Sequence, residues 1–229
     1  MGIGIEAIVN RQIQRWNLEM QRLKEEKAGT VPPRPVITVS RALGSGGGEV
    51  GRCVAERLNC QVVDRRIIEQ IAERSEVRRD LVETLDEHAR SQIEAWFEGL
   101  LRRRLFDESD YLRHLVEVLH SFAELGSVVI VGRGANFIAQ RRPHLDVRVV
   151  ASQEKRVERL VEKRKITPDE ALAEIRKSDS ERSKFVSRLF GRDWEDPLAY
   201  DLVINTDRIC TPCVAAIIET AWFQRISSA

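Results

Sequence analysis

The sequence lacks any uninterrupted run of about 18 apolar residues, which is the length that a membrane-spanning helix needs. Its N-terminal stretch, MGIGIEAIVNRQIQRW, also lacks the basic start, the apolar core and the small-residue cleavage site of a secretory signal. From these two absences we expect a cytoplasmic protein that does not associate with a membrane.

A surplus of charge is also missing, because 37 Lys and Arg residues face 36 Asp and Glu residues. A formal net charge of +1 does not fit a protein whose whole surface binds nucleic acid electrostatically. The highly charged stretch 152–197 is nearly balanced as well. No nucleic-acid partner is therefore predicted.

Cysteines are few, and only one pair has a suggestive spacing. Cys210 and Cys213 form a single C-x-x-C, and the other two cysteines do not supply a second pair at metal-ligand spacing. The favoured interpretation is ordinary thiols in a reducing compartment, with zinc or redox chemistry as the less favoured alternative. No metal site of this kind is predicted.

Short apolar runs separated by helical patterns dominate the rest of the chain. The five runs expected to be strands are residues 36–40, 61–63, 127–131, 146–151 and 202–205. They read as strands buried on both faces, and their alternation with helices predicts an α/β fold with a parallel sheet. A chain of 229 residues can build one such domain with an inserted subdomain.

The chain ahead of the first strand shows helical spacing over residues 4–28 and is then broken by AGTVPPRP. We expect residues 1–34 to form a helix and a proline-rich linker, and residues 35–229 to form the main domain. The helix either packs on the domain or pairs two copies as a homodimer. The sequence leaves both alternatives open.

Two long helical stretches interrupt the strand pattern, at residues 65–125 and 152–197. Both are expected over the carboxyl ends of the strands, where α/β sheets bind ligands. The second contains Thr167-Pro168-Asp169-Glu170, whose cap hydroxyl, proline and glutamate predict a helix start with a capping box.

A glycine-rich turn follows the first strand in VITVSRALGSGGGEVGRCVAERL, and a helical pattern follows the turn. Backbone N–H groups at such a helix start, aided by the helix dipole, bind phosphate without any side chain. Against the pattern G-x-x-x-x-G-K-[ST], Arg41 stands at the first glycine and Gly47 at the lysine. A turn with no ligand is the alternative. The residues predicted to hold phosphate are Gly44, Ser45, Gly46, Gly47, Gly48 and Arg41.

A second glycine turn occurs in SVVIVGRGANFIA, where Gly132-Arg133-Gly134 follows another strand. An arginine at the carboxyl edge of a strand can clamp a phosphate through two hydrogen bonds. The alternative is a tight turn with an exposed arginine. Two such turns in one α/β chain favour a nucleotide as the ligand.

Taken in order, these stretches resemble the cytidylate kinase-like family of P-loop proteins, over about residues 36–223. The resemblance rests on both glycine turns together with VVDRRIIEQIAERSEV and DSERSKFVSRLFGRDWEDPLAYDLVINTD. It implies a three-layer P-loop NTPase fold with a five-stranded parallel sheet, a helical NMP-binding insertion at 65–125 and a lid at 152–197. The implied activity transfers the γ-phosphoryl group of ATP to CMP or dCMP, with Mg²⁺.

The resemblance also implies site residues. It assigns catalytic roles to Arg133, Arg182 and Asp179, and substrate binding to Asp64, Arg133 and Arg176. Asn205 and Thr206 are expected near the adenine, and either Asp64 or Asp179 is expected to hold Mg²⁺ through water. Two departures stand out: Gly134 replaces the aspartate that follows the Gly-Arg pair in cytidylate kinases, and Ile175-Arg176 replaces an Arg-Asp pair.

The missing loop lysine leaves two hypotheses, although members of this branch often carry glycine there. In the first, an arginine from the lid or from position 41 replaces its charge, and the protein is a kinase. In the second, the protein binds a nucleotide without efficient transfer and acts as a sensor or partner module.

Overall fold

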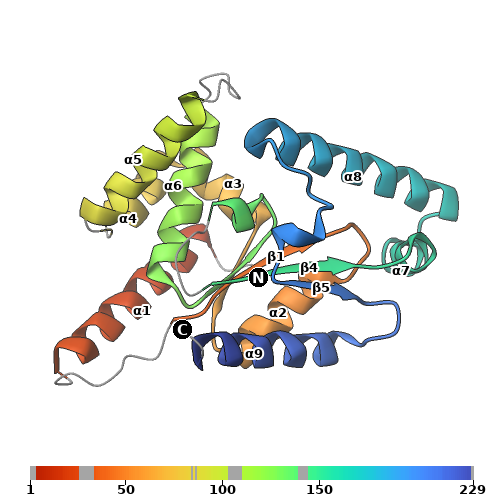
Figure 1. Ribbon diagram of the computed structural model, residues 1–229, viewed down its shortest axis with the longest axis horizontal. Coiled ribbons are helices and arrows are strands. Elements are labelled where there is room, and N and C mark those ends of the chain that lie inside the picture. Colours follow the sequence, from red (N-terminus) through yellow and green to blue (C-terminus); the bar gives the residue numbers. More distant parts are fainter. Residues whose placement is uncertain are drawn as a thin grey trace.

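The computed structural model describes residues 4–25, 34–83, 85, 87–102, 110–138 and 144–227. Its five strands are β1 (Val36–Arg41), β2 (Gln61–Asp64), β3 (Val128–Val131), β4 (Leu145–Val150) and β5 (Leu202–Asn205). All neighbouring pairs are parallel, in the order β2-β3-β1-β4-β5 (Figure 1). Each strand lies within one residue of its prediction at both ends, and the α/β fold is confirmed.

Strand β1 lies in the centre of the sheet, between β3 and β4. Val39 is in register with Val131 at the end of β3, and Arg41 is in register with Val149 of β4. Because all the strands point the same way, the turns after β1 and β3 leave the same edge side by side. The two glycine turns therefore lie beside each other.

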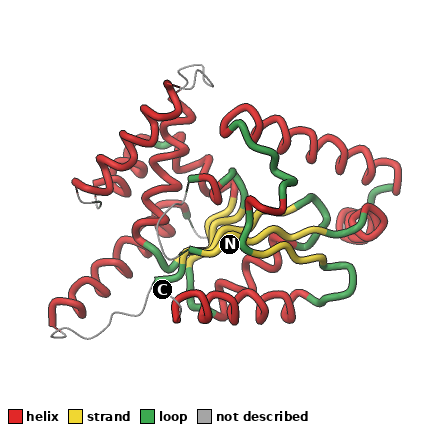
Figure 2. Tube along the Cα trace, in the orientation of Figure 1, coloured by secondary structure: helices red, strands yellow, loops and turns green. Residues whose placement is uncertain are grey.

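Helices cover both faces of the sheet and give three layers (Figures 1 and 2). One face packs against α2 and α9 through Val54, Ile218 and Trp222. The other packs against α3, α4 and α6 through Ile71, Leu115 and related side chains. The helices are α1 (Ile5–Glu25), α2 (Gly47–Arg57), α3 (Arg65–Glu73), α4 (Ser75–Glu83), α5 (Glu87–Arg102), α6 (Asp110–Leu125), α7 (Gln153–Arg164), α8 (Pro168–Phe190) and α9 (Thr211–Ser227).

The N-terminal helix α1 packs on the body of the protein. Ile8 and Val9 are buried, and the Gln12 side-chain amide, also buried, donates to the carbonyl of Gly126. The predicted linker falls largely on residues 26–33, which lie outside the described residues. Packing on the domain thus accounts for one side of α1, while its pairing with a second copy remains a prediction.

Helices α7 and α8 follow β4 and lie beyond the carboxyl edge of the sheet (Figure 1). The capping box at the start of α8 is confirmed. The Thr167 hydroxyl accepts from the Glu170 N–H at 3.3 Å, and the Glu170 carboxylate accepts from the Thr167 N–H at 2.8 Å. Among the described residues, no helix is both long and apolar enough to cross a membrane.

Candidate active site

The first glycine turn opens into a cavity of about 750 Å³, which is bounded by the loop, α7 and the start of α9. Gly44 and Gly46 have φ angles of 82° and 80°, which L side chains rarely adopt. Gly47 and Gly48 begin α2, so their N–H groups have no intrahelical acceptor. This cavity, here called the donor cavity, therefore presents a helix N-terminus suited to phosphate.

Two arginines of α7 donate hydrogen bonds to backbone carbonyls of the glycine loop. The Arg156 guanidinium donates to the carbonyl of Leu43 at 2.6 Å, and Arg159 donates to the carbonyl of Gly44 at 3.4 Å. Arg159 also donates to the Thr206 hydroxyl at 2.9 Å, and Thr206 lines the cavity. The loop carbonyls are therefore engaged on the protein side, which leaves the first N–H groups of α2 available to a ligand.

The Ser45 hydroxyl is committed to the loop itself. It donates to the carbonyl of Ala42 at 2.9 Å, and the residue is completely buried. We therefore assign Ser45 to loop shape and to its backbone contribution, and not to a hydroxyl contact with phosphate.

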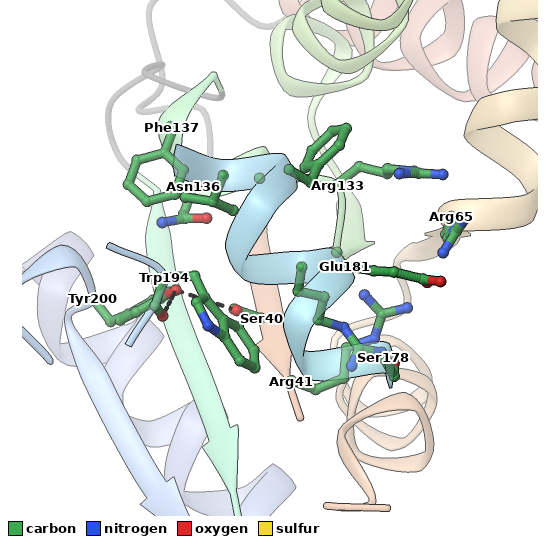
Figure 3. Close-up of a pocket in the computed structure, with 15 residues that line it drawn as sticks. Ser40, Arg41, Arg65, Arg133, Asn136, Phe137, Ser178, Glu181, Trp194 and Tyr200 are labelled. Atoms are coloured by element: carbon green, nitrogen blue, oxygen red, sulfur yellow. Dashed lines mark hydrogen bonds between the residues drawn. The ribbon is translucent and has the colours of Figure 1, made fainter. Parts of the chain in front are cut away.

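A second cavity of about 280 Å³ lies at the second glycine turn and is here called the acceptor cavity (Figure 3). Arg65 and Arg133 lie on one side of it, while Trp194 and Tyr200 lie on the other. Four arginines from different elements line it, namely Arg41, Arg65, Arg133 and Arg182.

Two carboxylates hold most of these arginines in place. Glu69 of α3 pairs with Arg133 and, at 3.3 Å, with Arg65. On the lid side, Asp179 of α8 pairs with Arg156 at 2.6 Å and with Arg182 at 3.4 Å. Each carboxylate thus orients two guanidinium groups at the site.

The arginines lie close enough to affect one another's titration. Burial, followed by Arg65, Arg41 and Arg182, lowers the pKa of Arg133 to about 10. Burial, followed by Arg182, likewise lowers the pKa of Arg41 to about 10. Mutual repulsion among buried cations is relieved by a bound anion, so the acceptor cavity is suited to a phosphate group.

The structure brings together most of the predicted residues, but not all of them. Arg133, Arg182 and the glycine loop converge on the two cavities. Asp64 caps α3 by accepting from the Ile67 N–H at 3.1 Å. Arg176 is exposed and lines neither cavity, because it lies on another side of α8. The prediction that Arg176 binds substrate has no support from this placement.

At Gly134, where cytidylate kinases carry an aspartate, a side chain would not fit. The φ angle there is 65°, and an ideal Cβ would overlap the ring of Phe190. Phe190 in turn stacks on Phe137 with ring centroids 5.1 Å apart. An aromatic cluster therefore occupies the place of that carboxylate.

The sequence reasoning missed Arg65, Arg156, Arg159 and Glu69. The RR pair after the second strand and the repeated arginines of EKRVERLVEKR were visible. However, charged helical positions usually face solvent, so only their contacts identify them.

The described residues include no group of three or more His, Cys, Asp or Glu side chains that could hold a metal ion. Asp64 is engaged in capping and Asp179 in two ion pairs. A role of either aspartate in holding Mg²⁺ through water therefore stays a prediction.

The parallel sheet with the order β2-β3-β1-β4-β5 and the glycine loop before α2 define a P-loop type of α/β protein. Residues 36–208 match the model of the cytidylate kinase-like family. The chain therefore belongs to the cytidylate kinase-like family.

Relatives of known name agree with this membership. The chain is 25% identical to a cytidylate kinase of Methanocaldococcus jannaschii over 189 residues, covering 81% of this chain and 96% of that one. It is 32% identical to a cytidylate kinase of Pyrococcus horikoshii over 99 residues, covering 43% and 51%. The crystal structure of an uncharacterized protein from Eubacterium ventriosum covers 84% of this chain and 100% of its own, with a TM-score of 0.64 at 19% identity, and shows the same fold.

Proposed function

We propose that this protein is a nucleotide kinase that transfers the γ-phosphoryl group of ATP to a nucleoside monophosphate, with CMP or dCMP as the first candidates. The carrying observation is that Arg41 and Arg182 line both the donor and the acceptor cavity. A phosphoryl group moving between the cavities would pass these two cations. The names of the archaeal relatives support the choice of CMP.

The arrangement supplies what phosphoryl transfer needs, which is positioning and neutralisation of charge. The N–H groups of Gly47 and Gly48 bind the donor phosphates, while Arg65 and Arg133 bind the acceptor phosphate. Mg²⁺ bound to the phosphates of ATP would supply further neutralisation of charge on the donor. Asp179 positions Arg156 and Arg182, since both of its oxygens are engaged by them.

Closure of 152–197 as a lid and binding of the acceptor by 65–125 are parts of this proposal. Water must be excluded during transfer because hydrolysis of ATP competes with it. Phe137, Phe185 and Trp194 give the acceptor cavity an apolar wall that would assist this exclusion.

The test is ADP release by the purified protein with ATP, Mg²⁺ and each nucleoside monophosphate in turn. We expect ADP release to depend on the acceptor and to be fastest with CMP or dCMP. Binding of ATP with no ADP above background for any acceptor would reject the kinase and favour the sensor hypothesis.

Two arginines on α8 provide a matched pair of variants. Arg182→Met removes a cation that lines both cavities, and we expect it to lower kcat about 100-fold. Arg176→Met removes an exposed cation outside both cavities, and we expect unchanged kinetics. Equal losses in both variants would contradict the placement of the site.

A further inference from the structure

Arg41 differs from the other arginines at the site because no carboxylate is paired with it. Glu69 and Asp179 pair with the neighbouring arginines, and within the described residues the guanidinium of Arg41 makes no hydrogen bond or ion pair. Asp64 acts on it only at longer range and is itself a helix cap. Arg41 is thus a half-buried cation without a protein partner, which is costly unless an anion binds.

The aliphatic stem of Arg41 explains the glycine at position 47. An ideal Cβ on Gly47 would overlap Arg41 Cβ and would lie 3.2 Å from both Arg41 Cγ and Val149 Cβ. The φ angle of Gly47 is not in the left-handed region, so sterics and not backbone conformation require glycine there. The arginine stem fills the space in which a lysine side chain at position 47 would begin.

The guanidinium of Arg41 extends to the second glycine turn. An ideal Cβ on Gly132 would overlap Arg41 Nη1 and would lie 2.8 Å from Cζ, so Gly132 also provides space for this side chain. Arg41 therefore starts at the donor loop, crosses over Gly47 and ends beside the turn that carries Arg133. This course places its charge on the wall shared by the two cavities.

We propose that Arg41 and Gly47 are a matched exchange, in which the arginine supplies the transition-state charge that a loop lysine supplies elsewhere, and the glycine leaves room for it. The inference rests on the proposed kinase function. In the step itself, the bond from the γ-phosphorus to the bridging oxygen breaks and a bond to an acceptor phosphate oxygen forms. ADP leaves with the electron pair, and Arg41 neither gives nor takes a proton.

The experiment compares the wild-type chain with Arg41→Met, Arg41→Gly, Gly47→Lys and the double variant Arg41→Gly/Gly47→Lys. Arg41→Met keeps most of the stem and removes the charge, so we expect kcat to fall about 100-fold. Its melting temperature should not fall, because a repelling cation is lost. Gly47→Lys alone should lose both activity and melting temperature through overlap with Arg41. The kcat of the double variant should be at least tenfold higher than the kcat of Arg41→Gly.

Binding of a fluorescent ATP analogue, measured without acceptor, provides a readout independent of turnover. Each single variant changes the Kd of the analogue by some factor relative to the wild type. We expect the double variant to bind the analogue more tightly than the product of those two factors predicts. Additive single effects, or an Arg41→Met variant with wild-type kcat and analogue affinity, would overturn the exchange. If the wild-type chain releases no ADP, the kinase function fails, and coupling in analogue binding still decides whether the two positions are matched.

Discussion

The two glycine turns have similar sequences and leave the same sheet edge, yet they present different groups to the site. The first is followed by α2, a helix of 11 residues, and offers backbone N–H groups. The second is followed by a 3₁₀ segment of three residues, Ala135–Phe137, which is too short for a useful helix dipole, and it offers the Arg133 side chain. A strand–glycine–helix pattern therefore predicts an anion site at the backbone only where the helix is long.

The largest effect is expected from breaking the first turn at Gly44. An ideal Cβ there would lie 2.8 Å from the Arg156 carbonyl oxygen, at a φ angle of 82°. Gly44→Ala should lower the free energy of unfolding by about 3 kcal/mol and abolish binding of an ATP analogue. Chemical denaturation and analogue titration measure both.

Gly48→Ala is the matched control for that change. A Cβ at Gly48 meets nothing within 4 Å, and its φ angle is not left-handed. We expect it to raise the free energy of unfolding by up to about 1 kcal/mol, because alanine favours the helix. Equal destabilisation by both variants would mean that the loop does not depend on its contact with α7.

Much of the fold could be predicted because the strands are buried on both faces. Val36, Ile37 and Val39 are completely buried, and such continuous apolar runs are unmistakable in sequence. The start of α8 could be predicted because the capping box uses neighbouring residues only. The glycine at position 47 could be noted but not explained, because the reason is its contact with Arg41, a residue of another element.

The site was predictable only where a motif fixed the position of a residue. Arg133 follows a strand after a single glycine, so its place at the sheet edge was implied. Arg156 and Arg159 lie on a helix rich in charges, and nothing local separates them from solvent-facing neighbours. Arg176 is the converse case, since the resemblance implied a substrate contact, but its side chain is exposed on α8 and lines neither cavity.

Removing the Arg133 side chain from the second glycine turn should weaken binding of the acceptor and leave binding of the donor nearly unchanged. Arg133→Met should lower kcat/KM for the acceptor about 100-fold while ATP-analogue affinity changes little. Glu69→Gln should act in the same direction and raise the acceptor KM a few-fold, because Glu69 orients Arg133 and Arg65. Steady-state kinetics at varied acceptor concentration, together with titration of the ATP analogue, measures both effects. If Arg133→Met weakened binding of the acceptor and of the ATP analogue equally, the assignment of one ligand to each turn would be wrong.

Asp179 joins the two turns, because Arg156 contacts the donor loop and Arg182 lines both cavities. Asp179→Asn should lower the free energy of unfolding by about 2 kcal/mol and raise KM about tenfold for donor and acceptor together. Asp169→Asn, on the exposed first turn of α8, is the control and should change neither KM. A selective effect on one substrate would show that the turns are not joined through this residue.

The helical layer beside the second turn contains a buried titratable group, His120 on α6. It is 6% exposed, its Nδ1 has no hydrogen-bond partner in the described part of the chain, and burial lowers its pKa although the nearby Glu124 opposes this. Because the unfolded chain then binds a proton more readily than the folded one, stability is lost as pH falls below about 6.5. His120→Leu should reduce this loss by at most about 1 kcal/mol, measured by denaturation at pH 7.5 and pH 5.5. A variant with the same pH dependence as the wild type would place the acid-sensitive group elsewhere in the molecule.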